Sequence, residues 1–400
     1  MWCLRLSPHV VRSVLAVLLS SLSAGPARAA LLVPEEYATI AKGLAAASYG
    51  DTVSIAPGTY YEYDLVWPSG VSILGRGLNP ESVVIDAQYQ GRVIGGEELL
   101  STNVLGSLTL RNGDAAGYYG SGLMAIGDPV LRDLLIEECK NSYRGVGLYL
   151  FGGATIIDCV LRNNTTTADD TYGGGAYLLD GGPAHPLLVQ HVEVSGNAAY
   201  SGSGIYYSGM HGILRELNVH DNAGSGLTVI NGGVDGIGPT VEFSLFANNT
   251  SSGVSFDAGI ILRMCTVVGN GFTGAWYGAV ANWSTWDHPM SPQILQCIIA
   301  GNKGSGISWW DATPFAITCN DVFGNAYAQY AGLPDQTGLS GNLSEDPQFC
   351  ARGGSLFGIE TSSPCAPANN GCGLLIGAFP VSCQGTATAP MSWSQIKGLY

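Results

Sequence analysis

A short pattern recurs along this chain at a step of about 26 residues, and this repeat limits the folds that the chain can adopt. Each copy holds two alternating, mostly apolar side chains, then two further residues, then Asn. The clearest copies are CVLRNN (159–164), VEVSGN (192–197), LNVHDN (217–222), FSLFAN (243–248), CTVVGN (265–270), CIIAGN (297–302) and NDVFGN (320–325). Two weaker copies precede them, LTLRNG (108–113) and LLIEEC (134–139). A repeat of this length predicts stacked copies of one small unit.

A second motif lies between copies of the first and reads Gly, apolar, any residue, apolar. Its copies are GLMA (122–125), GLYL (147–150), GAYL (175–178), GIYY (204–207), GLTV (226–229), GVSF (253–256), GAWY (274–277) and GISW (306–309). Strand side chains alternate between two faces, so both apolar residues of each copy are expected to point inward. One unit is then strand, turn, strand, loop. In a parallel stack, Val194, Val219 and Leu245 are expected to lie directly above one another.

Other all-β and α/β folds fit this repeat poorly. Helical crossovers need amphipathic segments between strands, and none is present there; a β-propeller blade needs about 40 residues. A single parallel β-helix remains. Asn side chains tolerate left-handed turns and bond to stacked neighbours, so the recurring Asn predicts an asparagine ladder, with ordinary surface turns as the alternative. Its predicted members are Asn164, Asn197, Asn222, Asn248, Asn270, Asn302 and Asn325.

The strands and the Asn column resemble the right-handed parallel β-helix of the pectate lyase-like superfamily. The opening YATIAKGLAAASYGDTVSIAPGTYYE (37–62), followed by GVSILGRG and VVIDAQ, is similar to the start of its secreted bacterial members. The resemblance implies a helix over about Ile40–Ala47 that covers the first coil. SEDPQFC (344–350) and the terminal WSQIKGLY resemble the closing segment of exported β-helix repeat proteins. The fold alone does not imply one activity, because it hosts lyases, hydrolases, adhesins and inert surface proteins.

The sequence divides into four predicted parts. Residues 1–29 have the charge, the apolar stretch and the A-x-A ending of a signal peptide, so the mature protein is expected to be secreted or on the cell surface after cleavage near Ala29. Residues 30–326 form the β-helix with its N-terminal helical cap. Residues 327–384 form a Cys-rich cap at the other end, and 385–400 a tail of unassigned role.

Cysteines are expected to pair in the predicted C-terminal cap. Nine remain after signal removal, and four of them are close together, which indicates one or two disulfides in an exported chain. These candidates are Cys350, Cys365, Cys372 and Cys383. The pairing is not readable from the sequence. Three others fall at an inward strand position and are expected to be buried, with Cys265 and Cys297 near enough to pair.

Charge limits the partners. The formal net charge is −15 and only 12% of residues are charged, so nucleic acid is not an expected partner, and no stretch of the mature chain is apolar enough for a membrane span. The oligomeric state is not readable from the sequence.

Aromatic residues at outward strand positions suit sugar rings and predict a polysaccharide or cell-surface glycan as partner; the alternative is that long inserts cover these rings. The predicted substrate-binding residues are Tyr149, Tyr177, Tyr206, Trp276 and Trp310.

Carboxylates on the same edge leave an enzymatic role open. The weak catalytic candidates are Asp257, Asp311 and Asp180, since hydrolases need two carboxylates across the scissile bond and lyases use clustered Asp for calcium. No metal-binding motif is present, so no metal or other cofactor is expected. Calcium becomes an expected cofactor only if the protein is a lyase. The favoured reading is an exported polysaccharide-binding β-helix. A lyase or hydrolase is the second reading, and a structural or adhesive rod the third.

Overall fold

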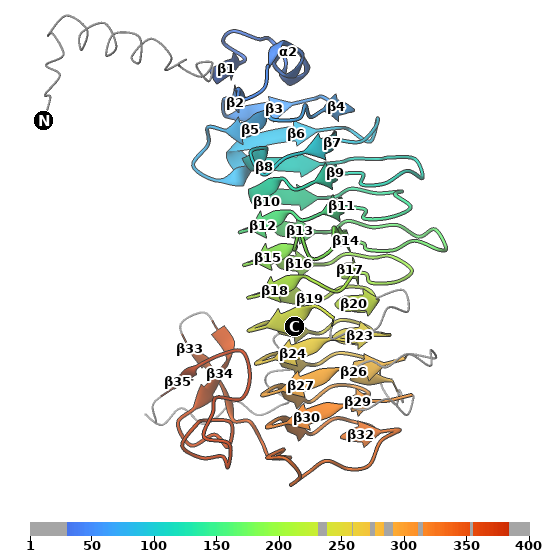
Figure 1. Cartoon of the computed structure of the whole chain (residues 1–400), viewed down its shortest axis with the longest axis vertical. Helices are drawn as coiled ribbons and strands as arrows, with labels where there is room; N and C mark the ends of the chain where they lie inside the picture. Colours follow the sequence, from blue (N-terminus) through green and yellow to red (C-terminus); the bar gives the residue numbers. More distant parts are fainter. Residues whose placement is uncertain are drawn as a thin grey trace, which may run out of the picture.

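The computed structural model describes residues 30–230, 238–257, 259–272, 277–283, 291–310, 315–352 and 355–383. These residues form one long column of stacked coils, with a helix at the N-terminal end and a small three-stranded unit at the side (Figure 1). The predicted signal peptide (1–29) and tail (385–400) lie outside the described residues. In the described residues, no helix is both long enough and apolar enough to cross a membrane.

One strand of each coil joins a narrow parallel sheet that runs along one side of the column. Its strands correspond to the second sequence motif. They are β4 (Leu65–Val66), β7 (Ile94–Leu99), β9 (Leu123–Gly127), β11 (Leu148–Gly152), β14 (Ala176–Asp180), β17 (Ile205–Ser208), β20 (Leu227–Ile230), β23 (Val254–Phe256), β26 (Gly278–Asn282), β29 (Ser305–Ser308) and β32 (Tyr330–Ala331).

The other strands form a large bent sheet, and most coils contribute two of them. The first coils supply β1 (Ala30–Val33), β2 (Thr52–Ile55), β3 (Gly58–Tyr60), β5 (Ser72–Gly75), β6 (Val83–Asp86), β8 (Val104–Arg111) and β10 (Val130–Glu137), with the 3-10 turn η1 (Pro80–Ser82) before β6. Before the bend lie β12 (Thr155–Ile157), β15 (Leu188–Gln190), β18 (Ile213–Arg215), β21 (Thr240–Glu242), β24 (Ile261–Arg263), β27 (Gln293–Leu295) and β30 (Ala316–Thr318). After it lie β13 (Val160–Arg162), β16 (Glu193–Ser195), β19 (Asn218–His220), β22 (Leu245–Ala247), β25 (Thr266–Val268), β28 (Ile298–Ala300) and β31 (Asp321–Phe323).

From β11 to β31 each coil has three strands, so the expected unit of two holds only for the coils β7–β8 and β9–β10. The strands that the sequence did not indicate are those before the bend: β12, β15, β18, β21, β24, β27 and β30. Each is three residues long and points its middle side chain inward, such as Ile156 and Leu214. A residue with positive φ follows each of them and turns the chain into the next strand, as at Asp158, with φ of 54°. One inward side chain per strand gives no alternation that a sequence pattern could detect.

The interior is a continuous stack of apolar side chains shared by all three faces. Val194 pairs with Val219, and Val219 pairs with Phe246, each fully buried. The expected vertical arrangement therefore holds, but its third member is Phe246 and not Leu245. Leu245 points outward, and the C-terminal segment covers it, which explains why an apolar residue is tolerated at this outward position. Together with the parallel register throughout both sheets, this stack confirms the predicted all-β parallel β-helix.

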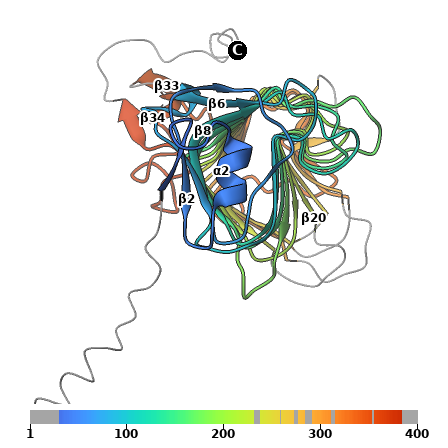
Figure 2. The same ribbon diagram turned by 90° about the horizontal axis from the view of Figure 1, so that it is seen from above.

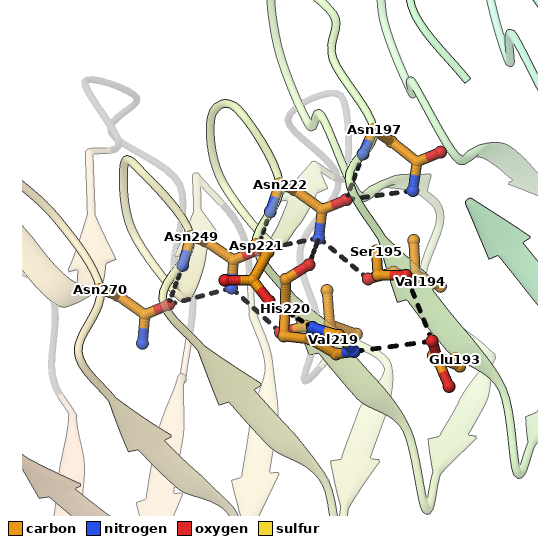
Figure 3. A network of polar contacts seen from close by, with 10 residues as sticks. All are labelled: Glu193, Val194, Ser195, Asn197, Val219, His220, Asp221, Asn222, Asn249 and Asn270. Atoms are coloured by element: carbon orange, nitrogen blue, oxygen red, sulfur yellow. Dashed lines mark hydrogen bonds and ion pairs between the residues drawn. The ribbon is translucent and has the colours of Figure 1, made fainter. Parts of the chain in front are cut away.

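A buried asparagine ladder runs along one corner of the column (Figure 3). At each step, the side-chain oxygen of one Asn accepts hydrogen bonds from both the backbone N–H and the side-chain amide of the Asn in the coil before it. Asn197 donates in this way to Asn222 over 3.0 Å for both bonds. The ladder contains Asn164, Asn197, Asn222, Asn249, Asn270, Asn302 and Asn325.

Asn249 takes the ladder position that was predicted for Asn248. The ladder Asn always follows the last inward residue by three positions, and that residue is Phe246. Asn248 instead occupies the preceding left-handed position, with φ of 53°, where other coils carry Asn, Asp or Gly. Two consecutive asparagines and an outward apolar Leu245 made both registers plausible from the sequence.

The helix α2 (Ile40–Ala46) closes the N-terminal end, as the resemblance implied. Seen down the column in Figure 2, α2 lies across the end of the stack. It buries Ile40 and Leu44 against the first coil. Thr39 caps it by accepting a hydrogen bond from the Lys42 N–H, and the Glu62 carboxylate accepts from the N–H groups of Ile40 and Ala41.

The Cys-rich segment packs beside the column and not over its end, contrary to the expectation. Its strands β33 (Phe349–Arg352), β34 (Ser355–Glu360) and β35 (Val381–Cys383) form a small sheet outside the large one (Figures 1 and 2). Phe349, Phe357 and Ile376 pack on the outward side chains of β22, β25 and β28. These outward positions are apolar, which explains why this segment turns back along the column.

Two disulfides hold this lateral segment. Cys350 bonds to Cys383 within it, and Cys372 bonds to Cys319 at the bend of the large sheet. The prediction that Cys365 is paired was wrong, because Cys365 is a buried free thiol. Cys319 was not predicted to pair, since its partner is 53 residues away and meets it only after the segment folds back. Cys159, Cys265 and Cys297 are buried and free. The disulfide between Cys265 and Cys297, which the sequence left as a possibility, does not form.

Candidate functional site

The outer face of the narrow sheet carries two columns of outward side chains, fixed by its register. The first column begins with Val66, Gly95 and Met124 and continues through Tyr149, Tyr177 and Tyr206 to Thr228 and Ser255. The second column lies two residues further along each strand. It contains Ile126, Phe151, Leu179, Ser208 and Ile230.

The three tyrosines of the first column are stacked on one another. Ring centroids lie 5.6 Å apart between Tyr149 and Tyr177 and 5.1 Å apart between Tyr177 and Tyr206, with nearly parallel planes. Tyr119 extends the stack beyond Tyr149, at 4.6 Å. Tyr172 packs edge-on against Tyr206. The stack therefore packs as a small aromatic core outside the sheet.

Loops cover this tyrosine stack. Residues Tyr119, Arg144, Tyr172 and Ser201, one from each of four successive loops, pair as isolated parallel bridges, so the loops stack as the coils do. The Arg144 guanidinium lies 5.1 Å from the centre of the Tyr177 ring. Tyr177 is only 5% exposed, and burial raises its pKa. The sequence left open whether the outward rings face a ligand or are covered by inserts. In the structure, the rings of Tyr149, Tyr177 and Tyr206 are covered.

The predicted tryptophans fall elsewhere. Of the motif GAWY, only Tyr277 is among the described residues; β26 begins after it, at Gly278, and Val280 takes the inward position. Trp276 lies outside the described residues, and Tyr277 is exposed instead of inward. Trp310 is 51% exposed and its ring centroid lies 5.7 Å from that of Tyr277. These two rings form an exposed aromatic patch beyond the end of β29.

Three hollows follow one another on this face in successive coils. The cap hollow, of about 290 Å³, lies between α2 and β4 and is lined by Leu44, Tyr63 and Val66. The central hollow, of about 630 Å³, extends over β4, β7 and β9. It shares Asp64 to Val66 and Pro68 with the cap hollow. The His185 hollow, of about 300 Å³, continues over β9, β11 and β14. We call this row the narrow-sheet groove.

The central hollow is lined by glycines of β7, which present no side chain to it. Gly95 occupies the position of the first outward column that carries tyrosines further along. A Cβ atom there would approach the Arg92 side chain to 3.2 Å. The Arg92 guanidinium is held to one side by hydrogen bonds to the carbonyls of Tyr119 and Gly120. From β4 to β14 the row spans four strand spacings, or about 19 Å along the column.

The His185 hollow combines an aromatic ring with an oriented histidine. Phe151, at 43% exposure, lines it together with Asp128, Asp180 and His185. His185 Nδ1 lies 2.6 Å from Asp128 Oδ2, and the Gly153 N–H donates to the other oxygen over 2.9 Å. Because the carboxylate accepts, the neutral ring carries its hydrogen on Nδ1 and leaves Nε2 as an acceptor. The pair can bind a hydroxyl or accept its proton.

Of the predicted acidic residues, Asp180 and Asp257 are not brought together. The Asp180 carboxylate accepts from the Tyr207 hydroxyl and from the N–H groups of Gly182, Met210 and His211. Burial raises its pKa, but the His211, Gly182 and Met210 N–H groups and the Tyr207 hydroxyl outweigh burial, so its pKa is lowered. Asp180 is therefore an ionised anchor for the turn after β17. Asp257 is half-buried directly after β23, the eighth strand of this sheet from its N-terminal end, whereas Asp180 lies in β14, the fifth; Asp311 lies outside the described residues.

Sequence reasoning missed most of the groove. Strand β7 reads IGGEEL and lacks the second apolar residue of the motif, so Gly95 and Glu97 were not placed on this face. Phe151 lies within β11, and Asp128 comes directly after β9; the motif did identify both strands. Their outward position was readable, but His185 comes from an insert whose position only the folded chain defines.

Comparison with known proteins places the fold. Residues 107–287 match the family model described as "Right handed beta helix region". The chain is a right-handed parallel β-helix protein, as the resemblance predicted. No curated protein sequence is significantly similar to it.

Several solved structures are similar to the chain. The A-module of a mannuronan C-5 epimerase from Azotobacter vinelandii is 16% identical, covers 76% of this chain and 93% of its own, and gives a TM-score of 0.43. A pectate lyase is 12% identical over 86% of this chain and 91% of its own, with a TM-score of 0.45. A family 6 alginate lyase variant is 14% identical over 92% of this chain and 58% of its own, with a TM-score of 0.49.

Proposed function

We propose that this is an exported protein that binds a polysaccharide along the narrow-sheet groove, after loss of residues 1–29. The observation that carries the proposal is the succession of three hollows over neighbouring strands of the narrow sheet, with Phe151 exposed in the last of them. An elongated row suits an extended chain better than a compact ligand. Apolar surface with nearby carboxylate, imidazole and backbone groups suits sugar rings, whose faces are apolar and whose rims carry hydroxyls.

The proposal moves the predicted aromatic contact from the first outward column to the second. Tyr149, Tyr177 and Tyr206 support the loops beside the groove, and Phe151 supplies the exposed ring. Trp310 and Tyr277 are a second proposed contact, about five strand spacings beyond β14. The two disulfides support an oxidising, extracytoplasmic location.

Glycan-array binding followed by affinity electrophoresis tests this function. Removal of the ring in Phe151→Ala is expected to weaken binding about tenfold, since burial of an aromatic side chain by a ligand contributes about 1.5 to 3 kcal/mol. Gly95→Leu fills the central hollow and should weaken binding further. The matched control is Phe243→Ala, which removes an exposed Phe from the large sheet, away from the groove. Binding unchanged in both groove variants would refute the proposal.

A second candidate function is cleavage of the same chain. The observation in its favour is the Asp128–His185 pair, because an imidazole held by a carboxylate is the usual arrangement of a general base. Release of reducing ends or unsaturated products from any bound glycan, lost in His185→Ala, would establish it. Binding without product formation at long incubation would leave the binding function alone.

A further inference from the structure

The charges that line the narrow-sheet groove are unequal. Carboxylates line it in both larger hollows: Asp64, Glu97 and Glu98 in the central hollow, Asp128 and Asp180 in the His185 hollow. The basic side chains that line the same hollows are Arg92, which is cationic, and His185. Because carboxylates outnumber cations and the whole chain carries a net charge of −15, the potential in the groove is negative.

Both basic side chains are already held by the protein. Arg92 donates through Nε and Nη2 to the carbonyls of Tyr119 and Gly120, and His185 is hydrogen-bonded to Asp128. A ligand carboxylate would therefore have to replace these contacts to gain a cationic partner. A ligand carboxylate would also lose its hydration when it enters a groove of negative potential, and both effects cost free energy.

Two carboxylates are in the opposite situation. Within the described part of the chain, the side chains of Glu97 and Glu98 have no hydrogen-bond or ion-pair partner, and both are exposed at the rim of the central hollow. Asp64 accepts the Arg92 backbone N–H at 3.1 Å; burial lowers the pKa of the Arg92 guanidinium, and the charges of Asp64 and Glu97 oppose that shift. These three groups line the same hollow as Gly95. They can accept hydrogen bonds from an ammonium group at little desolvation cost.

We propose, on the basis of the proposed groove function, that the ligand is a chain of amino sugars with free ammonium groups, and that polyuronates are excluded. The elongated hollows select an extended chain, Phe151 contacts a ring face, and the carboxylates at Asp64, Glu97 and Glu98 select positive charge. Each exposed ion pair contributes little by itself, but several along one chain act together and raise the association rate. Binding is then expected to weaken as salt screens these pairs.

Calorimetric titration with three hexasaccharides tests this inference: glucosamine units, N-acetylglucosamine units, and galacturonate units. The glucosamine oligomer is expected to bind the wild type most tightly and to lose affinity as salt is raised. The double substitution Glu97→Gln/Glu98→Gln should reduce that affinity about fivefold and leave N-acetylglucosamine binding unchanged. The control Asp169→Asn/Asp170→Asn removes the same charge from an exposed loop and should change neither.

The outcomes separate the inference from the function on which it rests. If the N-acetylated or the galacturonate oligomer binds as tightly as the glucosamine oligomer, and Gly95→Leu still abolishes binding, the groove function stands and the charge selection is overturned. Equal glucosamine affinity in the wild type and the Glu97/Glu98 variant would also overturn it. If Gly95→Leu changes binding of no oligomer, both proposals fail.

Discussion

Asp321 is expected to make the stability of the lateral segment depend on pH. This carboxyl is fully buried at the start of β31, beneath the Cys-rich segment. It accepts the Glu345 N–H over 3.1 Å and lies 3.2 Å from the Cys365 thiol. Burial raises its pKa to about 7, and the neighbouring carboxylates of Glu345 and Asp346 add to the increase. In the described residues no cationic side chain forms an ion pair with it.

The sign follows from proton linkage. Between the unfolded pKa of 3.8 and the folded pKa of about 7, the folded protein binds more protons at this site, so stability falls as pH rises. From pH 5 to pH 8 the loss amounts to about two pK units, or roughly 2 to 3 kcal/mol. Above that range both states are ionised and the contribution becomes constant.

Urea unfolding of the oxidised protein at pH 5 and pH 8 measures this loss. Asp321→Asn keeps the shape and stays neutral, so its stability should be nearly the same at both pH values and exceed the wild type at pH 8. Asp335→Asn is the control, because that carboxyl is exposed and its pKa is lowered by the Thr337 N–H. A pH dependence in Asp321→Asn as steep as in the wild type would refute the assignment.

Three other expected outcomes test the fold. Asn222→Ala removes a ladder residue that holds both coils beside it and should cost about 3 kcal/mol in urea unfolding, whereas Asn248→Gly, at a left-handed position outside the ladder, should change stability by less than about 1 kcal/mol. Tyr177→Ala should cost about 3 to 5 kcal/mol in thermal unfolding. Non-reducing peptide mapping should recover Cys319 joined to Cys372; a different partner for either would contradict the docked segment.

The interior of the fold was predictable because one rule repeats in every coil. Apolar residues at alternate positions, followed by Asn three residues after the last of them, placed the pairing of Val194 with Val219 in the correct register. The rule failed at Leu245, where the outer face is apolar as well. Alternation identifies an inward face only when the other face meets water, and here Phe349 and Ile376 cover it.

The site was less predictable, because it depends on what covers each outward residue. Tyr177 and Phe151 follow the same motif and both point outward, yet one is covered and the other exposed. The difference lies in loops whose tyrosines and Arg144 stack over the first column only. Contacts between loops of different coils leave no local pattern, so the sequence indicated a face of the sheet and not the column that a ligand reaches.

The first outward column itself explains where the groove runs. Its residue is Val at β4, Gly at β7, Met at β9 and Tyr from β11 to β17, so the outward side chains become larger from β7 to β17. Where the side chain is absent, the hollow is deep; where the tyrosines begin, the loops close on them. A chain bound over Gly95 therefore has to pass to the second column before β11, and Phe151 is the exposed ring that it meets there. The glycine at β7 and the tyrosines from β11 to β17 would together set the path of the proposed ligand.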